Sequence, residues 1–148
     1  MSALRRLDHV AVAVRDTKEA LTYFVERLGL PLLRSEELAA PPVRLTYLDA
    51  GNILIQLVEP LDDETEIARS IHENGEGLHH ICFAVDDVTR TATELAEDTT
   101  VPPILGSGRG PDGTERVTAF VPGHAPFGVR IECVEYRPED DTKPITTA

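Results

Sequence analysis

The sequence predicts an α+β fold made of two tandem modules, each with the element order βαβββ. Two pairs of aligned segments predict it: Leu7–Val14 with Leu78–Val85, and Gly51–Glu59 with Phe127–Glu135. Both pairs occur in the same order and at similar separations, which indicates that one structural unit occurs twice. We expect one domain of four parts: module 1 over 5–60, an acidic linker over 61–76, module 2 over 77–136 and a flexible tail over 137–148.

Residue periodicity predicts the elements of the first module. Asp16 and Glu19 form a capping-box-like helix start. The helix that follows carries apolar residues at helical spacing on one face: Ala20, Leu21, Phe24, Val25 and Leu28. Runs of β-branched and apolar residues between turn residues predict the strands: Leu7–Val14, Leu30–Glu37, Val43–Leu48 and Ile53–Glu59.

The second module repeats this order with a weaker helix. Its expected elements are a strand at Leu78–Val85, a helix at Val88–Glu97, and strands near Ile104, at Val117–Val121 and at Val129–Val134. The linker between the modules contains a short helical stretch with Ile67 and Ile71 on one side.

Composition limits the partners. The chain of 148 residues has a formal net charge of −12, which argues against nucleic acid or an anionic membrane as the main partner because both attract a basic surface. No apolar run approaches the ~18 residues of a membrane span, and Met1–Val10 has no signal-peptide core. Cys82 and Cys133 suit a reducing compartment. We expect a cytoplasmic protein that acts on a small molecule.

Strand alternation places four polar residues on related faces. Side chains of one parity share a face of a strand. His9 and His80 therefore lie on the faces that carry small residues, opposite the apolar faces expected to pack on helices. Gln56 and Glu132 occupy matching positions in the last strands of the two modules. Each module thus supplies one imidazole and one oxygen donor.

These four residues indicate a metal site. A single strand histidine is more often a hydrogen-bonded core residue than a ligand. A carboxylate within an apolar strand, however, must be paired or bind a metal, because burying it alone is very costly. Two imidazoles and two oxygen donors suit a divalent ion such as Co, Mn, Ni, Zn or Fe. The predicted metal ligands are His9, Gln56, His80 and Glu132.

With these residues on a repeated βαβββ unit, the chain resembles the vicinal oxygen chelate superfamily of glyoxalases, bleomycin resistance proteins and dioxygenases. Three segments are similar to methylmalonyl-CoA epimerases: Leu7–Val10, Gln56–Pro60 and Asn74–Ile81. Gln56, where glyoxalase I has Glu, favours the epimerases. The resemblance runs from about Leu7 to Glu135. It implies a cup-shaped half-open barrel, a metal held by the four side chains, and a homodimer.

The resemblance also implies a reaction. A metal-bound acyl-CoA, most simply methylmalonyl-CoA, would lose its α-proton through a metal-stabilised enolate, with Glu132 as a candidate proton-transfer group. Arg109, His124 and Arg44 are candidate substrate-binding residues, and Arg44 could instead pair with surface acids. His79 is expected at the rim or behind the ligands.

Two departures from the epimerases put the substrate in question. Leu45 stands where some of them carry a glutamate, and Val121–Gly128 replaces a usual His-Pro-Lys stretch. Two alternatives therefore stay open. One is another metalloenzyme of the superfamily, glyoxalase-like or an iron dioxygenase that uses His9, His80 and Glu132 as a two-histidine, one-carboxylate triad. The other is a metal-free protein that binds a small molecule or assists a biosynthesis.

Overall fold

A computed structural model describes residues 4–138 and joins eight strands into one sheet in the order β2-β3-β4-β1-β5-β8-β7-β6. The strands are β1 (Leu4–Ala13), β2 (Leu32–Ala39), β3 (Pro42–Asp49), β4 (Leu54–Pro60), β5 (Gly77–Val85), β6 (Leu105–Arg109), β7 (Glu115–Phe120) and β8 (Ile131–Arg137). The helices are α1 (Thr17–Leu21), which continues as the π-helical segment η1 (Thr22–Arg27), then α2 (Glu66–Asn74), α3 (Val88–Leu95) and the 3₁₀ turn η2 (Pro126–Gly128). The tail expected over 137–148 lies outside the described residues beyond position 138.

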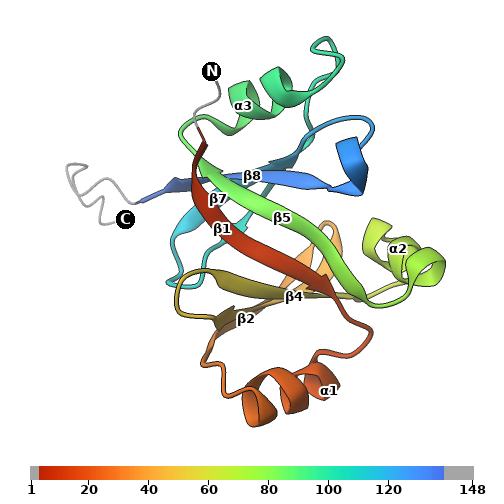
Figure 1. The fold of residues 1–148 in the computed structure, drawn as a ribbon, viewed down its shortest axis with the longest axis vertical. Coiled ribbons are helices and arrows are strands. Elements are labelled where there is room, and N and C mark those ends of the chain that lie inside the picture. The colour runs from red at the N-terminus through yellow and green to blue at the C-terminus, as the bar shows by residue number, and fades with distance from the viewer. Residues whose placement is uncertain (1–3, 139–148) are drawn as a thin grey trace, which may run out of the picture.

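The two modules meet along their first strands. Module 1 supplies β2-β3-β4-β1 and module 2 supplies β5-β8-β7-β6, so one order is the reverse of the other. β1 pairs antiparallel with β5, whereas β1 pairs parallel with β4 and β5 parallel with β8. β1 and β5 cross the middle of the molecule, with α1 at one end and α3 at the other (Figure 1). The predicted α+β fold of two βαβββ units is confirmed.

Repeated acidic residues fix the helices to the sheet. Asp16 and Asp87 are the N-caps of α1 and α3, and each accepts a hydrogen bond from the backbone N–H three residues later. Glu59 and Glu135, near the ends of β4 and β8, accept a hydrogen bond from the first backbone N–H of the same two helices. The repeat therefore preserves the groups that satisfy the free N–H groups of each helix start.

The first helix packs as predicted except at its end. Four of the five expected residues contact the core, namely Ala20, Leu21, Phe24 and Val25. Leu28, which the spacing predicts on the same face, is 51% exposed and lies away from it. Its N–H bonds to the carbonyl of Tyr23, five residues earlier. This bonding widens the turn relative to an α-helix, and Leu28 leaves the buried face.

The two faces of the sheet contact different neighbours, as the alternation predicted. The apolar residues facing the first helix are Val12, Val14, Leu48, Ile55 and Leu57. The inner face of module 1 carries Ala11, Ala13, Val43, Leu45 and Val58. Cys82 and Cys133 are buried free thiols whose clusters lie on opposite faces, in agreement with their opposite parity.

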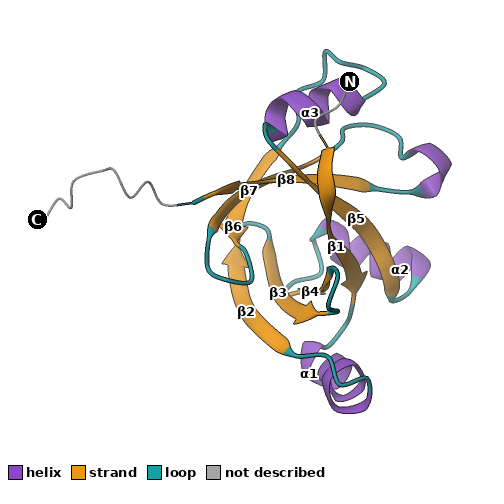
Figure 2. Ribbon diagram, turned by 60° about the vertical axis from the view of Figure 1, so that its left-hand side comes forward, coloured by secondary structure: helices purple, strands orange, loops and turns teal. Residues whose placement is uncertain are grey.

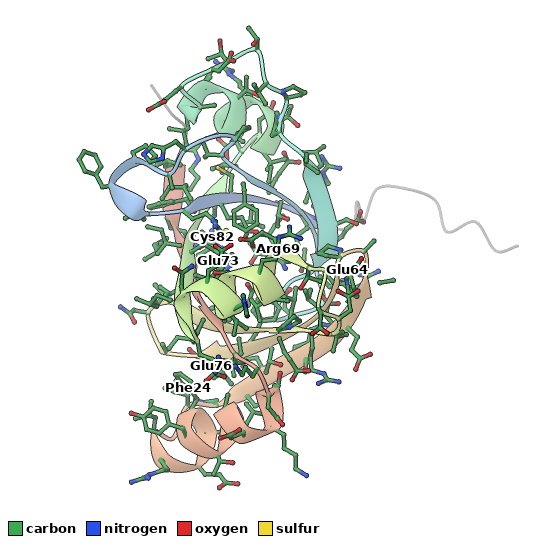
Figure 3. The ribbon with its side chains drawn as sticks, turned by 90° about the vertical axis from the view of Figure 1, so that its right-hand side faces the viewer. Phe24, Glu64, Arg69, Glu73, Glu76 and Cys82 are labelled. Atoms are coloured by element: carbon green, nitrogen blue, oxygen red, sulfur yellow. The ribbon has the colours of Figure 1, made fainter. Side chains whose placement is uncertain are left out.

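Helix α2 covers part of the inner face. It begins after Thr65, whose hydroxyl accepts a hydrogen bond from the N–H of Ala68. Ile67 and Ile71 pack on the inner cluster of module 1. In Figure 3, α2 crosses the near side of the molecule, above the helix that carries Phe24. The segment between the modules thus helps to build the interior.

The outer strands β2 and β6 bring the sheet close to a barrel. The backbone N–H of Arg109 on β6 donates to Oε1 of Glu36 on β2 at 3.1 Å. Figure 2 shows the sheet curving until these strands lie near each other. The cup-shaped half-open barrel implied by the resemblance is confirmed by this arrangement.

Some boundaries in module 2 differ from the predictions. β6 begins at Leu105, after an Ile104 that is 90% exposed. β8 begins at Ile131 and not at Val129, because Val129 caps η2 and its N–H bonds back to the carbonyl of Pro126. Among residues 4–138, no helix is long and apolar enough to cross a bilayer.

Candidate metal centre

Two neighbouring rows across the central strands hold the predicted ligands. The first row is His9 on β1, Cys82 on β5 and Glu132 on β8; the second is His80 on β5, Ala11 on β1 and Gln56 on β4. In each row the histidine of one module is in line with the oxygen donor of the other module: His9 with Glu132, and His80 with Gln56. A small side chain separates them in both rows. The repeat, and the seam between β1 and β5, therefore bring four distant residues to one place inside the cup.

Three donor atoms converge at this place. Oε1 of Glu132 lies 3.3 Å from Nε2 of His9 and 3.5 Å from Nε2 of His80. All three residues are buried, and their candidate ligand atoms lie within 4.8 Å of one another. Neither contact has hydrogen-bond geometry, so all three atoms lack a hydrogen-bond partner within the described residues. Buried polar atoms are nearly always partnered. A divalent cation would satisfy all three.

Gln56 completes the set chemically. Its side chain is buried, and Nε2 is 3.2 Å from the hydroxyl oxygen of Tyr47, to which it donates. That bond orients the amide and leaves the carbonyl oxygen as the donor for the site. The four side chains thus fit a divalent first-row ion, with two nitrogen and two oxygen donors.

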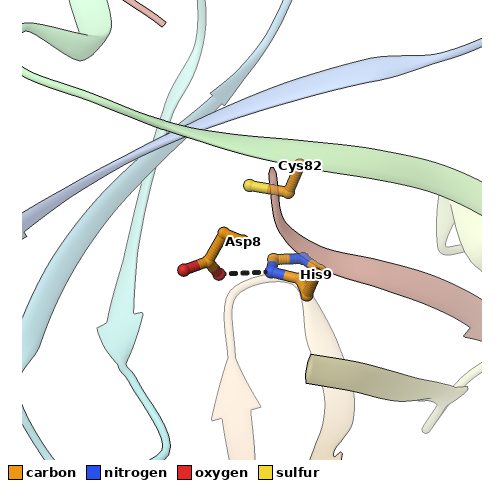
Figure 4. Close-up of side chains that lie close together, drawn as sticks. All are labelled: Asp8, His9 and Cys82. Carbon is orange, nitrogen blue, oxygen red and sulfur yellow. Dashed lines mark hydrogen bonds and ion pairs between the residues drawn. The ribbon is translucent and has the colours of Figure 1, made fainter. Parts of the chain in front are cut away.

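Asp8 orients His9. A register shift in the β1–β5 pairing falls between Leu7 and His9, and such a bulge re-aims a side chain. The Asp8 carboxylate accepts a hydrogen bond from Nδ1 of His9 at 2.7 Å, drawn in Figure 4, and another from the Tyr136 hydroxyl at 3.0 Å. Nδ1 of His9 therefore carries the proton, and Nε2 is the free lone pair that faces the site.

His79 contacts the outer ring nitrogen of His80, as Asp8 contacts that of His9. A second register shift, between Ala11 and Val12, leaves His79 as the extra residue of β5. Nδ1 of His79 lies 2.8 Å from Nδ1 of His80, and Nε2 of His79 lies 3.0 Å from Oε2 of Glu66 on α2. Both bonds would be satisfied by a proton on Nδ1 of His80 and another on Nε2 of His79, with Arg130, which also lies against Nε2 of His79, donating to Glu66. The expected place of His79 behind a ligand agrees with this contact.

Replacing Asp8 by asparagine should weaken metal binding about 10- to 100-fold, the usual cost of losing a partner of a ligating histidine. Asparagine keeps the shape but removes the charge that fixes the His9 ring. The dissociation constant for Co²⁺, measured by titration calorimetry, would report the change. Asp86→Asn is the matched control, because Asp86 is exposed and pairs with Arg5. Equal affinities for the Asp8 variant and the control would contradict the prediction.

The electrostatics of the cluster favour an ionised carboxylate between two imidazoles. Burial opposes ionisation of Glu132, but His80 and His9 outweigh it and hold the pKa of Glu132 well below its usual value. Burial lowers the pKa of His80. For His9 burial acts in the same direction, but the hydrogen bond to Asp8 and the negative charge of the nearby Glu132 outweigh it and raise the pKa of His9. Ionised Glu132 and neutral His80 are the forms that ligate metals.

Glu66 provides a test by pH. The hydrogen bond to His79 lowers the pKa of Glu66 to about 2 from an ordinary 4.5. A lowered folded-state pKa gives stability that is present above pH 4.5 and is lost as pH falls toward 2. The side chain is half exposed, so the effect should stay below about 1 kcal/mol. Glu66→Gln should be less stable than the native protein at pH 6, and chemical unfolding at pH 6, 4 and 3 should show the gap shrinking. A gap that widens in acid would refute this.

The candidate substrate-binding residues lie elsewhere. Arg44 pairs with Glu37 and, at 3.0 Å, with Glu59. Nη1 of Arg109 donates to the carbonyl oxygen of Gly113 in its own hairpin, and His124 is exposed in the loop after β7. The structure thus brings the four metal-ligand candidates together and leaves these three at the periphery.

Two aromatic residues and a buried arginine belong to the cup but were not among the candidates. Tyr47 and Phe120 occupy matching positions in the two modules, opposite Gln56 and Glu132 respectively. Tyr47 meets the ring of His9 edge-on, and Phe120 meets that of His80. Arg116 is buried beside Tyr47. Strand parity, applied to β3 and β7, could have placed all three on the inner face.

Fold and site together define a vicinal oxygen chelate type of protein, in which paired βαβββ modules surround a site with two histidines and two oxygen donors. The chain belongs to the Glyoxalase/Bleomycin resistance protein/Dioxygenase superfamily, whose family model matches residues 8–117. The superfamily predicted from the sequence is therefore confirmed. Its relatives point to an epimerase-like member.

Several relatives carry the epimerase name. Human mitochondrial methylmalonyl-CoA epimerase is 32% identical over 93 residues, which are 62% of this chain and 53% of that enzyme. The ethylmalonyl-CoA/methylmalonyl-CoA epimerase of Cereibacter sphaeroides is 32% identical over 104 residues, covering 70% of this chain and 76% of the enzyme. The matched region thus spans only about half of the human protein.

Solved structures agree along nearly the whole chain. The methylmalonyl-CoA epimerase of Mycobacterium tuberculosis has a TM-score of 0.72 at 27% identity, over 93% of this chain and 92% of that one. A methylmalonyl-CoA epimerase in complex with methylmalonyl-CoA and NH4+ has a TM-score of 0.74 at 27% identity, over 89% and 94%. The resemblance to epimerases drawn from the sequence is confirmed at this level.

Proposed function

We propose that the chain is a metal-dependent epimerase that removes and returns the α-proton of a malonyl-type acyl-CoA, most simply methylmalonyl-CoA. The observation that carries the proposal is the convergence of three unpartnered buried atoms, Nε2 of His9, Nε2 of His80 and Oε1 of Glu132. The relatives named as epimerases support the reaction and the acyl-CoA class.

The proposed ligands are His9, Gln56, His80 and Glu132. A divalent ion bound there would act as a Lewis acid that stabilises the negative charge formed on the substrate when the α-proton leaves. Gln56 is neutral, so Glu132 is the single anionic ligand and the site keeps a net positive charge. That charge favours an anionic substrate and its more anionic transition state.

The surrounding residues prepare the site before substrate arrives. Asp8 bonds directly to His9, whereas Glu66 bonds to His79, which in turn contacts His80. Tyr47 holds the amide of Gln56. Groups fixed in this way need little reorganisation during the reaction, which is the main source of electrostatic catalysis.

Epimerisation needs a proton donor or acceptor on each face of the carbon. Glu132 is our candidate for one of them, because its ionised carboxylate is buried in the cup. Leu45 cannot be the other, since it is an apolar residue buried with Val43 and Val58. The second group in this chain must therefore differ from the glutamate that some epimerases carry at this position.

Proton exchange tests the proposal directly. Protein loaded with Co²⁺ or Mn²⁺ is incubated with one epimer of methylmalonyl-CoA in heavy water, and NMR follows α-deuteration and loss of optical purity. Both should appear with the native protein and fall to background with Glu132→Gln. Glu94→Gln, on the exposed side of α3, is the control that should keep full exchange.

Other outcomes would point to the alternatives. Oxygen uptake with ferrous iron and no exchange would favour a dioxygenase. A protein that purifies without metal, and whose ligand affinity does not depend on Glu132, would be a binding protein. We also propose a homodimer, from the superfamily resemblance alone, and sedimentation velocity would measure its mass. The proposal of a cytoplasmic location rests on the two cysteines, which suit a reducing compartment.

A further inference from the structure

Arg116 is a buried cation on the inner face of the cup. Its residue exposure is 4%, although arginine is almost never buried without a partner. On β7 it alternates with Val117 and Ala119, which pack on the α3 side of the sheet. The side chain of Arg116 therefore faces the interior, on the same side as the metal-ligand candidates.

The guanidinium reaches across the cup. Its carbon Cζ lies 5.5 Å from the ring centroid of Tyr47, which belongs to β3 in the other module. Tyr47 in turn contacts the ring of His9 and the amide of Gln56. Arg116 is thus linked through Tyr47 to two of the proposed ligands, His9 and Gln56.

This cation has no anionic partner among residues 4–138. Its Nε and Nη1 are buried without a hydrogen bond, and no described carboxylate lies within ion-pair distance. Glu36 is nearby, but its carboxylate already accepts from the N–H of Arg109 and lies 3.6 Å from Arg34. An arginine stacked on one aromatic ring still has its in-plane donors unsatisfied.

The fold does not require a cation here. The residue at the matching position of module 1 is Val43, since Val43 and Arg116 each lie four residues before the aromatic residue opposite the oxygen donor. Val43 simply packs in the apolar cluster. Burying an unpaired charge is costly, so a group that fold assembly does not need points to a ligand that supplies the opposite charge.

We propose that Arg116 binds the free carboxylate of the small molecule held in the cup. The planar guanidinium matches a carboxylate with two parallel hydrogen bonds. Its buried Nε, one donor of such a fork, has no partner among the described residues. The inference rests on the proposed function for the identity of that molecule as a malonyl-type acyl group. It adds that the chain selects acyl groups with a carboxylate over uncharged ones, through a residue outside the metal-ligand set.

Malonate tests this without metal or turnover. Chelator-treated protein is titrated with malonate and with uncharged malonamide, followed by NMR and by thermal unfolding. Malonate should bind at least about tenfold more tightly than malonamide, as expected for charge-assisted hydrogen bonds. Arg116→Gln should lose about 10- to 100-fold in malonate affinity and become insensitive to the charge of the ligand. Arg90→Gln, an exposed arginine on α3 that pairs with Glu94, should behave like the native protein.

Thermal unfolding without ligand separates a binding role from a structural one. If Arg116 serves to bind a ligand, Arg116→Gln removes an unpaired charge and should leave the midpoint of thermal unfolding unchanged or raise it. A lowered midpoint together with unchanged malonate affinity would show that the residue only braces Tyr47, and would overturn the proposal. Equal binding of malonate and malonamide by the native protein would overturn it as well. Should Arg116→Gln fail to fold, Arg116→Lys, which loses the planar fork, must show the loss of affinity.

The two proposals fail separately. Absence of proton exchange with every metal, together with malonate binding that depends on Arg116, would reject the epimerase and keep the carboxylate site. Exchange that proceeds while Arg116→Gln binds malonate normally would do the reverse.

Discussion

Replacing Glu132 by glutamine should remove divalent metal from the protein. Glu132 is the single anionic donor of the proposed set, and its oxygen is the atom that both histidine Nε2 atoms approach. Losing a hydrogen-bond partner of a ligating histidine typically costs about 10- to 100-fold in metal affinity, and losing this ligand should cost more than about 100-fold. Elemental analysis of the purified variant and a Co²⁺ titration would measure the loss.

The fold should survive this change. Glutamine has nearly the same shape, and the variant no longer buries a charge between the strands, so its unfolding midpoint without metal should stay close to the native one. Glu115→Gln, an exposed residue of β7, is the matched control and should retain metal. A Glu132 variant that binds Co²⁺ as tightly as the control would remove the basis of the proposed site.

The sequence contained enough to place the ligands on one face but not to show what supports them. The parity of His9, His80, Gln56 and Glu132 followed from alternation alone, and the observed rows agree with it. The support for the histidines depends on two bulges, which put Asp8 beside His9 and His79 beside His80. With regular alternation, each of these neighbours would point to the opposite face of its strand. A bulge changes the face of one residue, and its position depends on the pairing of distant strands.

The meeting of the modules is also a long-range property. A repeat predicts two similar units, but the seam could form between several pairs of strands. Here β1 pairs with β5, which joins the two histidine-bearing strands directly. Glu132 on β8 then lies two strands away from His9 on β1, and Gln56 on β4 lies two strands away from His80 on β5. Local periodicity carries no information on this choice. The metal centre could therefore be proposed from the sequence only through the assumption that the modules converge.

The helix after β1 shows the same division between local and long-range control. Its apolar spacing predicted the residues that pack on the core through Val25, because α-helical geometry repeats every 3.6 residues. The π-type bonds of η1 then change the angle between residues, and Leu28 turns outward. Leu57 of β4, by contrast, is completely buried against this helix.

These two leucines offer a paired test of the core. Leu57→Ala should lower the free energy of unfolding by about 2–5 kcal/mol, since it leaves a cavity where β4 meets the helix. Leu28→Ala should cost less than about 1 kcal/mol, because half of that side chain is already in water. Urea unfolding followed by circular dichroism measures both. Leu57 also adjoins Gln56, so its loss should weaken Co²⁺ binding as well, whereas Leu28→Ala should leave the metal affinity unchanged. Equal destabilisation by the two substitutions would mean that the helix packs as a regular α-helix, with Leu28 turned into the core.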